Sequence, residues 1–198
     1  MLLSGMPIMS AQTPPDQDFN LETAVKFLST TKSMGEYYPL AIEGVKDPKT
    51  KAEMMKLFKQ QLAAIAAIGA SHKQINLSVL FPFLDIDTSG NPGVFEYPTT
   101  DVNQLRSWWP VTAVILDMPG AAESLEKFTL DKKNPVNYRL DAFLMLSYVD
   151  KTRIKNVAYN LTKEFQSSSE KSKQTILIII SDVQAGHNGF GGGFSLPE

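Results

Sequence analysis

The sequence contains no cysteine among its 198 residues. Disulfide bonds, thiolate metal sites, cysteine nucleophiles and thiol redox switches are therefore excluded. The absence of cysteine does not indicate a compartment, because chains without disulfides occur on both sides of a membrane. Histidine is also scarce: His72 and His187 are the only two, and neither has another histidine at the spacing of zinc ligands.

The sequence also has no marked excess of positive or negative charge. The formal net charge is −2 at pH 7 and the isoelectric point is near 5.7, so the sequence offers no electrostatic basis for nucleic-acid binding. No apolar run approaches the ~20 residues that a membrane-spanning helix needs. The first Lys or Arg is Lys26, so residues 1–15 lack the basic segment of a signal peptide. We expect a cytoplasmic protein with no membrane span and no nucleic-acid partner.

What the sequence does contain is typical of a folded protein. Hydrophobic residues make up 43% of the chain and charged residues 20%, which is a globular composition. The length is sufficient for one domain with a buried core. We expect a single globular domain over residues 20–185, between a flexible arm at 1–19 and a flexible glycine-rich tail at 186–198.

Three segments show the spacing of amphipathic helices. Residues 21–28 carry one apolar stripe, with Asp18 or Asn20 as the N-terminal cap. A longer helix is predicted from Pro48 to Ile68, capped by Asp47 and apolar all round in its second half. A third helix is predicted within residues 151–173, and its apolar face consists of Ile154, Val157, Ala158, Leu161 and Phe165.

Other segments favour strands. Residues 74–83 alternate apolar and polar side chains, and Pro82 places that strand at an edge or a bulge. Further strands are predicted at 94–97, 111–116, 138–149 and 175–181, and the last two flank the third helix in a β-α-β unit. The predicted fold class is therefore α+β: N-terminal helices packed on a mixed sheet of four to five strands, ending in that β-α-β unit.

The segment DIDTSGNPGVFE, residues 85–96, carries the sharpest chemical pattern. It resembles an EF-hand calcium loop, in which the matching residues Asp85, Asp87, Ser89 and Glu96 supply oxygen ligands. The resemblance implies a calcium or magnesium site at these four residues. The alternative is a polar hairpin turn, for which Asp, Ser, Gly, Asn and Pro are the usual residues.

The same segment follows an expected apolar strand, which suggests two further resemblances. A strand ending in D-x-D resembles the first motif of haloacid-dehalogenase-type phosphatases, which implies Asp85 as nucleophile, Asp87 as acid/base and Asp182 as a magnesium ligand. The strand-then-Asp pattern at Asp85 and Asp182 also resembles a von Willebrand type A domain. Four predicted apolar strands end near an aspartate, at Asp87, Asp117, Asp150 and Asp182, so these four would share one acidic edge, or else act as turn residues and helix caps.

Aromatic residues supply the candidates for partner binding. Trp108 and Trp109 are adjacent, so they cannot share one face of a helix or strand, and one of them is expected to anchor an interface. Phe190 and Phe194 in the glycine-rich tail are expected to contact the same kind of partner. The sequence thus favours a non-enzymatic binding or adaptor protein, or a subunit of a hetero- or homo-oligomer, with no cofactor. The alternative is a cation-dependent protein or phosphatase centred on Asp85 and Asp87.

Overall fold

The computed structural model describes residues 18–33, 44–86 and 109–186, and in these ranges the chain forms α-helices and short 3-10 helices without any β-strand. The predicted α+β fold with a mixed sheet is therefore wrong. One predicted strand, at 94–97, lies outside the described residues.

The first two helices agree with the sequence prediction. Helix α1 (Leu21–Thr30) begins at Asn20, whose side chain accepts a hydrogen bond from the backbone N–H of Thr23. Helix α3 (Pro48–Ala70) begins at Asp47, whose carboxylate accepts from the N–H of Thr50. These caps satisfy backbone donors that the first turn of a helix leaves free, which is why both start sites could be predicted.

The alternating segment 74–83 folds into two single-turn 3-10 helices, η1 (Leu77–Val79) and η2 (Phe81–Phe83), instead of a strand. Asn76 accepts a hydrogen bond from the N–H of Ser78, which starts the first turn. Phe81, Phe83 and Leu80 are all buried, so alternate side chains are not divided between a core and a solvent face. The alternation of apolar and polar residues in this segment therefore does not come from a β-strand with one buried and one exposed face.

Residues 111–116 belong to helix α5 (Pro110–Asp117), so the strand predicted there is wrong. Proline suits the first turn of a helix, and the six residues from Pro110 to Ile115 are all buried. A short apolar run that is buried on every side has no periodicity, so it does not distinguish a strand from a helix. Gly120, at φ 68°, then starts helix α6 (Ala121–Leu130).

The predicted β-α-β unit is three helices: α7 (Val136–Val149), α8 (Lys151–Gln166) and α9 (Lys173–Ala185). The helix predicted in this region is confirmed as α8, although it ends at Gln166 and not at residue 173, and all five residues of its expected apolar face are buried. The segments 138–149 and 175–181 are helical because each lies within an element of thirteen or fourteen residues that packs against other helices. Tertiary packing here overrides the strand propensity of the β-branched run TILIII.

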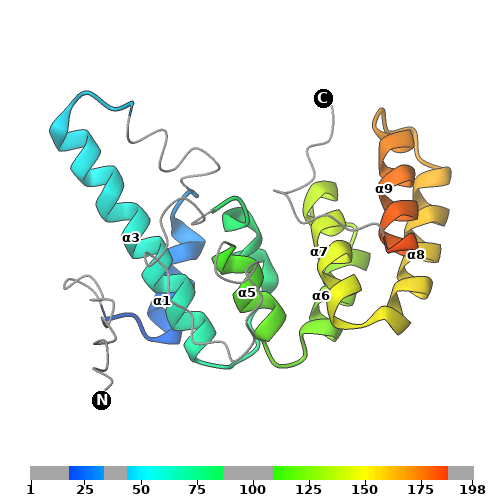
Figure 1. The fold of residues 1–198 in the computed structure, drawn as a ribbon, viewed down its shortest axis with the longest axis horizontal. Coiled ribbons are helices and arrows are strands. Elements are labelled where there is room, and N and C mark those ends of the chain that lie inside the picture. The colour runs from blue at the N-terminus through cyan, green and yellow to red at the C-terminus, as the bar shows by residue number, and fades with distance from the viewer. Residues whose placement is uncertain (1–17, 34–43, 87–108, 187–198) are drawn as a thin grey trace, which may run out of the picture.

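The helices form two groups that lie side by side (Figure 1). Helices α1, α3 and α5 make the left-hand group, and α6, α7, α8 and α9 make the right-hand group. Helix α5 contacts α3 on one side and both α6 and α7 on the other, so it joins the groups. The buried side chains form one continuous core, which includes Ile65 of α3, Phe81 of η2 and Leu161 of α8. No helix in the described ranges is long and apolar enough to cross a membrane.

Candidate functional site

The predicted cation loop lies only partly within the described residues. Asp85 follows η2 and is half-buried, whereas Asp87, Ser89 and Glu96 lie outside the described ranges. The Asp85 carboxylate is close enough to Tyr138 of α7 to help raise the pKa of that phenol, whose burial is the larger cause. Among the described residues, no group of three or more His, Asp or Glu side chains is arranged to hold a metal ion.

The acidic edge that the strand pattern predicted does not form, since none of its described members follows a strand. Asp117 is the last residue of α5, and Asp182 lies exposed within α9. Asp150 is the N-terminal cap of α8 and accepts from the N–H groups of Thr152 and Arg153, as the alternative cap interpretation required. The strand-end context of both the phosphatase and the von Willebrand resemblance is therefore wrong.

Of the four aromatic partner-binding candidates, only Trp109 is described. It precedes α5 directly and is half-buried. Trp108, Phe190 and Phe194 lie outside the described residues.

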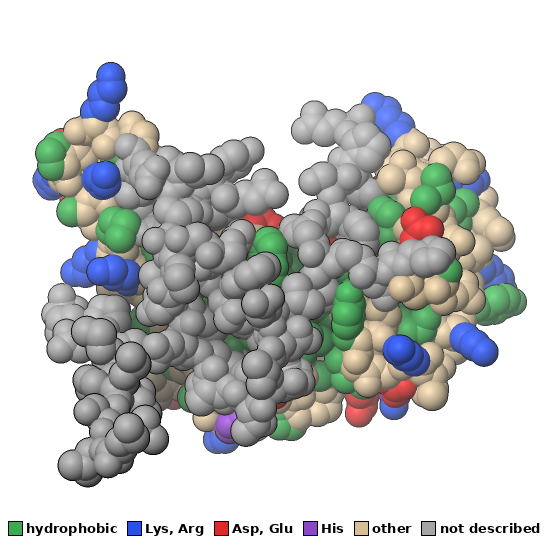
Figure 2. Space-filling model, in the orientation of Figure 1, with side chains coloured by type: hydrophobic (Ala, Val, Ile, Leu, Met, Phe, Trp, Pro, Cys, Tyr) green, Lys and Arg blue, Asp and Glu red, His purple; other side chains and the backbone are tan. Residues whose placement is uncertain are grey.

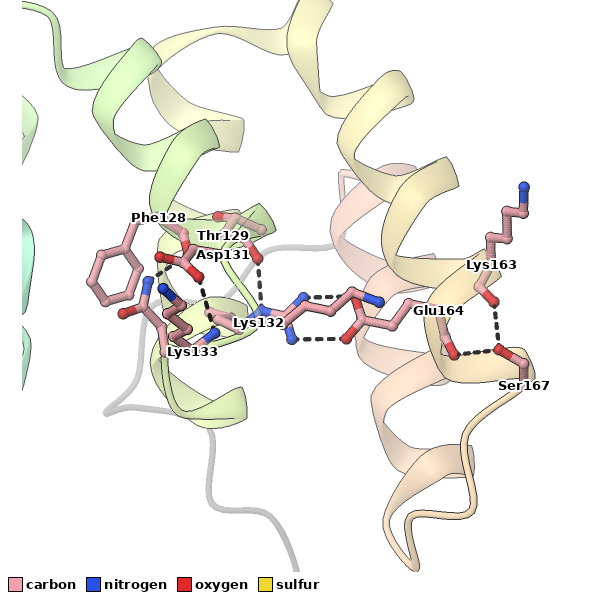
Figure 3. Close-up of polar contacts among 10 residues, drawn as sticks. Phe128, Thr129, Asp131, Lys132, Lys133, Lys163, Glu164 and Ser167 are labelled. Atoms are coloured by element: carbon pink, nitrogen blue, oxygen red, sulfur yellow. Dashed lines mark hydrogen bonds and ion pairs between the residues drawn. The ribbon is translucent and has the colours of Figure 1, made fainter.

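A polar hollow of about 550 Å³ lies where the segment before η1 meets α6. Its polar side chains already bond to one another or to nearby backbone: Gln74 donates to Ser124, and Asn134 donates to the carbonyl of Phe128. Asp131 accepts from the backbone N–H of Lys133 (Figure 3). These hydrogen bonds hold the turn after α6 in place. The polar side chains that line the hollow therefore have a structural role.

Helix α8 is held firmly in place from its inner side. The Arg139 guanidinium of α7 is 3% exposed and donates two hydrogen bonds to Glu164 of α8, at 2.9 and 2.8 Å. Its Nε donates to the carbonyl of Thr129 at 2.7 Å, which ties in the end of α6 (Figure 3). At the other end of α8, Arg153 pairs with Asp150 and with Glu126 of α6. Arg139 of α7 and Arg153 of α8 are thus both neutralised by carboxylates.

The large apolar side chains that are exposed in the described ranges all lie between the end of α7 and α9. They are Tyr148, Val149, Tyr159 and Ile178. Helix α9 is the most unusual, because not all isoleucines of its apolar run are buried in the core. Ile176 and Ile180 are buried, whereas Ile178 is 61% exposed and its neighbours Leu177 and Ile179 are half-buried.

The solvent face of α8 has a different character. Lys151, Lys155, Tyr159 and Lys163 follow one another at four-residue intervals, and all four are exposed. Asn156 and Asn160 lie beside this row and are exposed as well. Sequence analysis identified the buried face of α8 and overlooked this outer row, although its regular spacing was visible in the sequence.

Comparisons of the chain with protein-family models, with curated proteins and with solved structures found no match. The functional assignment therefore rests on the chain's own residues.

Proposed function

We propose that this chain is a non-enzymatic protein-binding protein, a subunit or adaptor in a larger protein assembly, that contacts its partner through its C-terminal helices. The observation that carries the proposal is the outer face of α9. The run from Ile176 to Ile180 is apolar on every side, as is usual for a buried segment, but α9 packs against α7 and α8 and leaves Ile178 61% exposed. A partner protein that covers this face would bury it.

The exposed apolar positions on the neighbouring helices support the same role. Tyr148 and Val149 at the end of α7 are 41% and 39% exposed, and Tyr159 on α8 is 66% exposed. Tyrosine is enriched in protein interfaces because its ring contributes a large apolar area while its hydroxyl group remains able to hydrogen-bond. The proposal places the assembly in the cytoplasm, which cell fractionation checks.

The experiment is to purify the tagged full chain from the cells that make it and to measure its assembly by light scattering. A complex heavier than the 21.9 kDa single chain, with a stoichiometric partner, is expected. Ile178→Glu should reduce retention of that partner by at least about tenfold, because a buried unpaired carboxylate is costly. The control is Gln184→Glu, an equally acidic change at an exposed position about 120° around the same helix from Ile178.

Thermal melts decide whether each variant is folded, and both should melt like the wild type because both sites are exposed. A monomer without a stoichiometric partner would contradict the proposal. So would a partner that Ile178→Glu retains as well as Gln184→Glu does.

A further inference from the structure

We infer that the solvent face of α8, formed by the row of Lys151, Lys155, Tyr159 and Lys163, docks an acidic helical segment of the partner protein. The inference rests on the proposed function and names the chemistry of the partner. It concerns a face of α8 that is separate from the exposed Ile178 of α9.

The row is a ridge that winds gradually around the helix, because each four-residue step turns about 40° around the axis. Residues four apart on a helix have Cβ atoms roughly 5–6 Å from each other, so the row runs for about 18 Å along the axis of α8. Every member is exposed, and the buried residues Ile154, Val157 and Leu161 lie on the opposite face. Figure 2 shows Lys and Arg side chains together with exposed apolar surface on the right-hand side of the molecule, where Figure 1 places α8 and α9.

The three lysines carry charge that the described part of the chain does not neutralise. Three carboxylates in or beside α8 are paired with arginines: Asp150 and Glu126 pair with Arg153, and Glu164 pairs with Arg139. No ion pair involves Lys151, Lys155 or Lys163 within the described ranges. Lys151 and Lys155 even lie in the i, i+4 relation that destabilises an isolated helix when the charges are alike.

Tyr159 gives the row an apolar centre. It is 66% exposed and lies between Lys155 and Lys163, one helical turn from each. An aromatic ring with charges on both sides resembles the arrangement of a binding hot spot, in which an anchor is surrounded by polar contacts that exclude water. The complementary partner surface has carboxylates at four-residue spacing with an apolar residue between them.

An acidic protein helix fits this face better than a nucleic acid does. Three ammonium groups at four-residue spacing, with Tyr159 between two of them, match carboxylates at the same spacing around an apolar residue, whereas nucleic-acid binding usually rests on many phosphate contacts from a larger basic patch. The Arg139–Glu164 and Arg153–Glu126 pairs hold α8 against α7 and α6, so the row is preorganised and docking requires little reordering.

The probe is a synthetic helical peptide of about twelve residues, long enough to match the row, with glutamates at four-residue spacing and a central leucine. Its affinity for the purified full chain is measured by calorimetry and its site by amide chemical shifts. A scrambled peptide of the same composition tests whether the spacing matters. A single-stranded oligonucleotide of the same net charge tests the nucleic-acid alternative.

The decisive variant reverses two charges of the row, Lys155→Glu with Lys163→Glu. Its matched control is Lys51→Glu with Lys56→Glu on the exposed first half of α3, which changes the net charge by the same amount. We expect the variant of the row to weaken peptide binding at least about tenfold and the control to leave it within about twofold. Tyr159→Ala should weaken binding about fivefold or more.

The expected shifts map to residues 151–166, and raising sodium chloride from about 0.05 to about 0.5 M should weaken binding because the Debye length falls. Equal losses in both double variants, tighter binding of the oligonucleotide than of the peptide, or no detectable binding of the peptide would overturn the inference. These results are independent of the Ile178→Glu experiment, so the assembly can be real while this docking face is wrong.

Discussion

The ring of Phe81 stacks on the ring of Phe128, with 4.2 Å between their centroids and 9° between their planes. Phe81 belongs to η2 and Phe128 to α6, so the stack connects the turn that follows α3 with the first helix of the C-terminal group. Both side chains are buried, at 1% and 7% exposure. The two helical groups therefore share one core at this point.

Phe81→Ala should destabilise the whole protein, because it leaves a cavity at the junction of the two groups. We expect a loss of about 3–5 kcal/mol in the free energy of unfolding, measured by urea denaturation. Phe81→Leu keeps most of the volume and loses the ring contact, so it should cost less than Phe81→Ala. A loss confined to one of two separate unfolding transitions would contradict the shared core.

Helix α3 offers a direct test of core against surface. Ile65 is fully buried, and Ile65→Ala should cost about 2–5 kcal/mol. Lys56 is exposed on the same helix, so Lys56→Ala should change the stability by no more than about 0.5 kcal/mol. Small and equal effects in chemical denaturation would mean that Ile65 is not packed in the monomer.

The Arg139–Glu164 ion pair predicts that the stability of the protein depends on pH. The hydrogen bonds from Arg139 are the main cause that holds the pKa of Glu164 below its ordinary value of 4.5. A carboxylate with a lowered folded pKa stabilises the protein above the unfolded pKa, and the contribution is lost as pH falls through the folded pKa. Stability should therefore decline below about pH 4.5, and this part of the decline should be missing in Glu164→Gln.

At neutral pH, Glu164→Gln should cost about 3 kcal/mol, at the low end for a broken buried pair, since Glu164 is 21% exposed and Arg139 only 3%. Lys132 lies 3.8 Å from Glu164 but is 73% exposed, so Lys132→Ala serves as the control and should cost less than about 0.5 kcal/mol. Urea melts at several pH values measure both effects. An acid response in Glu164→Gln as steep as in the wild type would refute the assignment.

For the segment 85–96 we predict that neither calcium nor magnesium raises the melting temperature, because Asp, Ser, Gly, Asn and Pro are also the usual residues of a polar turn without a cation. A calcium site with a dissociation constant near ~10 µM would add about 2.7 kcal/mol of stability at ~1 mM calcium, which is easily measured. The measurement is a thermal melt in chelator, calcium and magnesium. A rise that Asp85→Ala and Asp87→Ala both abolish would establish a cation site.

The helices that could be predicted are those with a cap and a single apolar stripe. Asn20, Asp47 and Asp150 mark the starts of α1, α3 and α8, and the alternation of buried and exposed residues in α8 follows the helical period. The segments at 111–116, 138–149 and 175–181 lack that signal because both their faces are apolar. The β-branched residues of 111–116 and 175–181 then favoured strands, whereas 138–149 contains only one β-branched residue, Val149. The packing of whole helices against each other corrects the prediction for all three segments.

The candidate site was missed for a related reason. Asp85, Asp87 and the tryptophans belong to residue types that often form functional sites, whereas the row on α8 consists of residue types that are common on any protein surface. Lys155, Tyr159 and Lys163 become a candidate only when the helix is known and the nearby carboxylates are seen to be paired with Arg139 and Arg153. The four-residue spacing can be read from the sequence, but the pairing of the nearby carboxylates with arginines can be seen only in the structure.

The order of contacts along the chain has a consequence for folding kinetics. Helices α6 to α9 pack against helices one or two positions away in sequence, whereas α3 reaches α5 across residues 71–109. Local contacts close small loops at low entropic cost, so the C-terminal group should form first and recruit α1 and α3 later. In pulsed hydrogen exchange, amides of α6, α7 and α8 should become protected before those of α1 and α3. The part of the chain that carries both proposed binding faces would then be the part that completes its structure earliest.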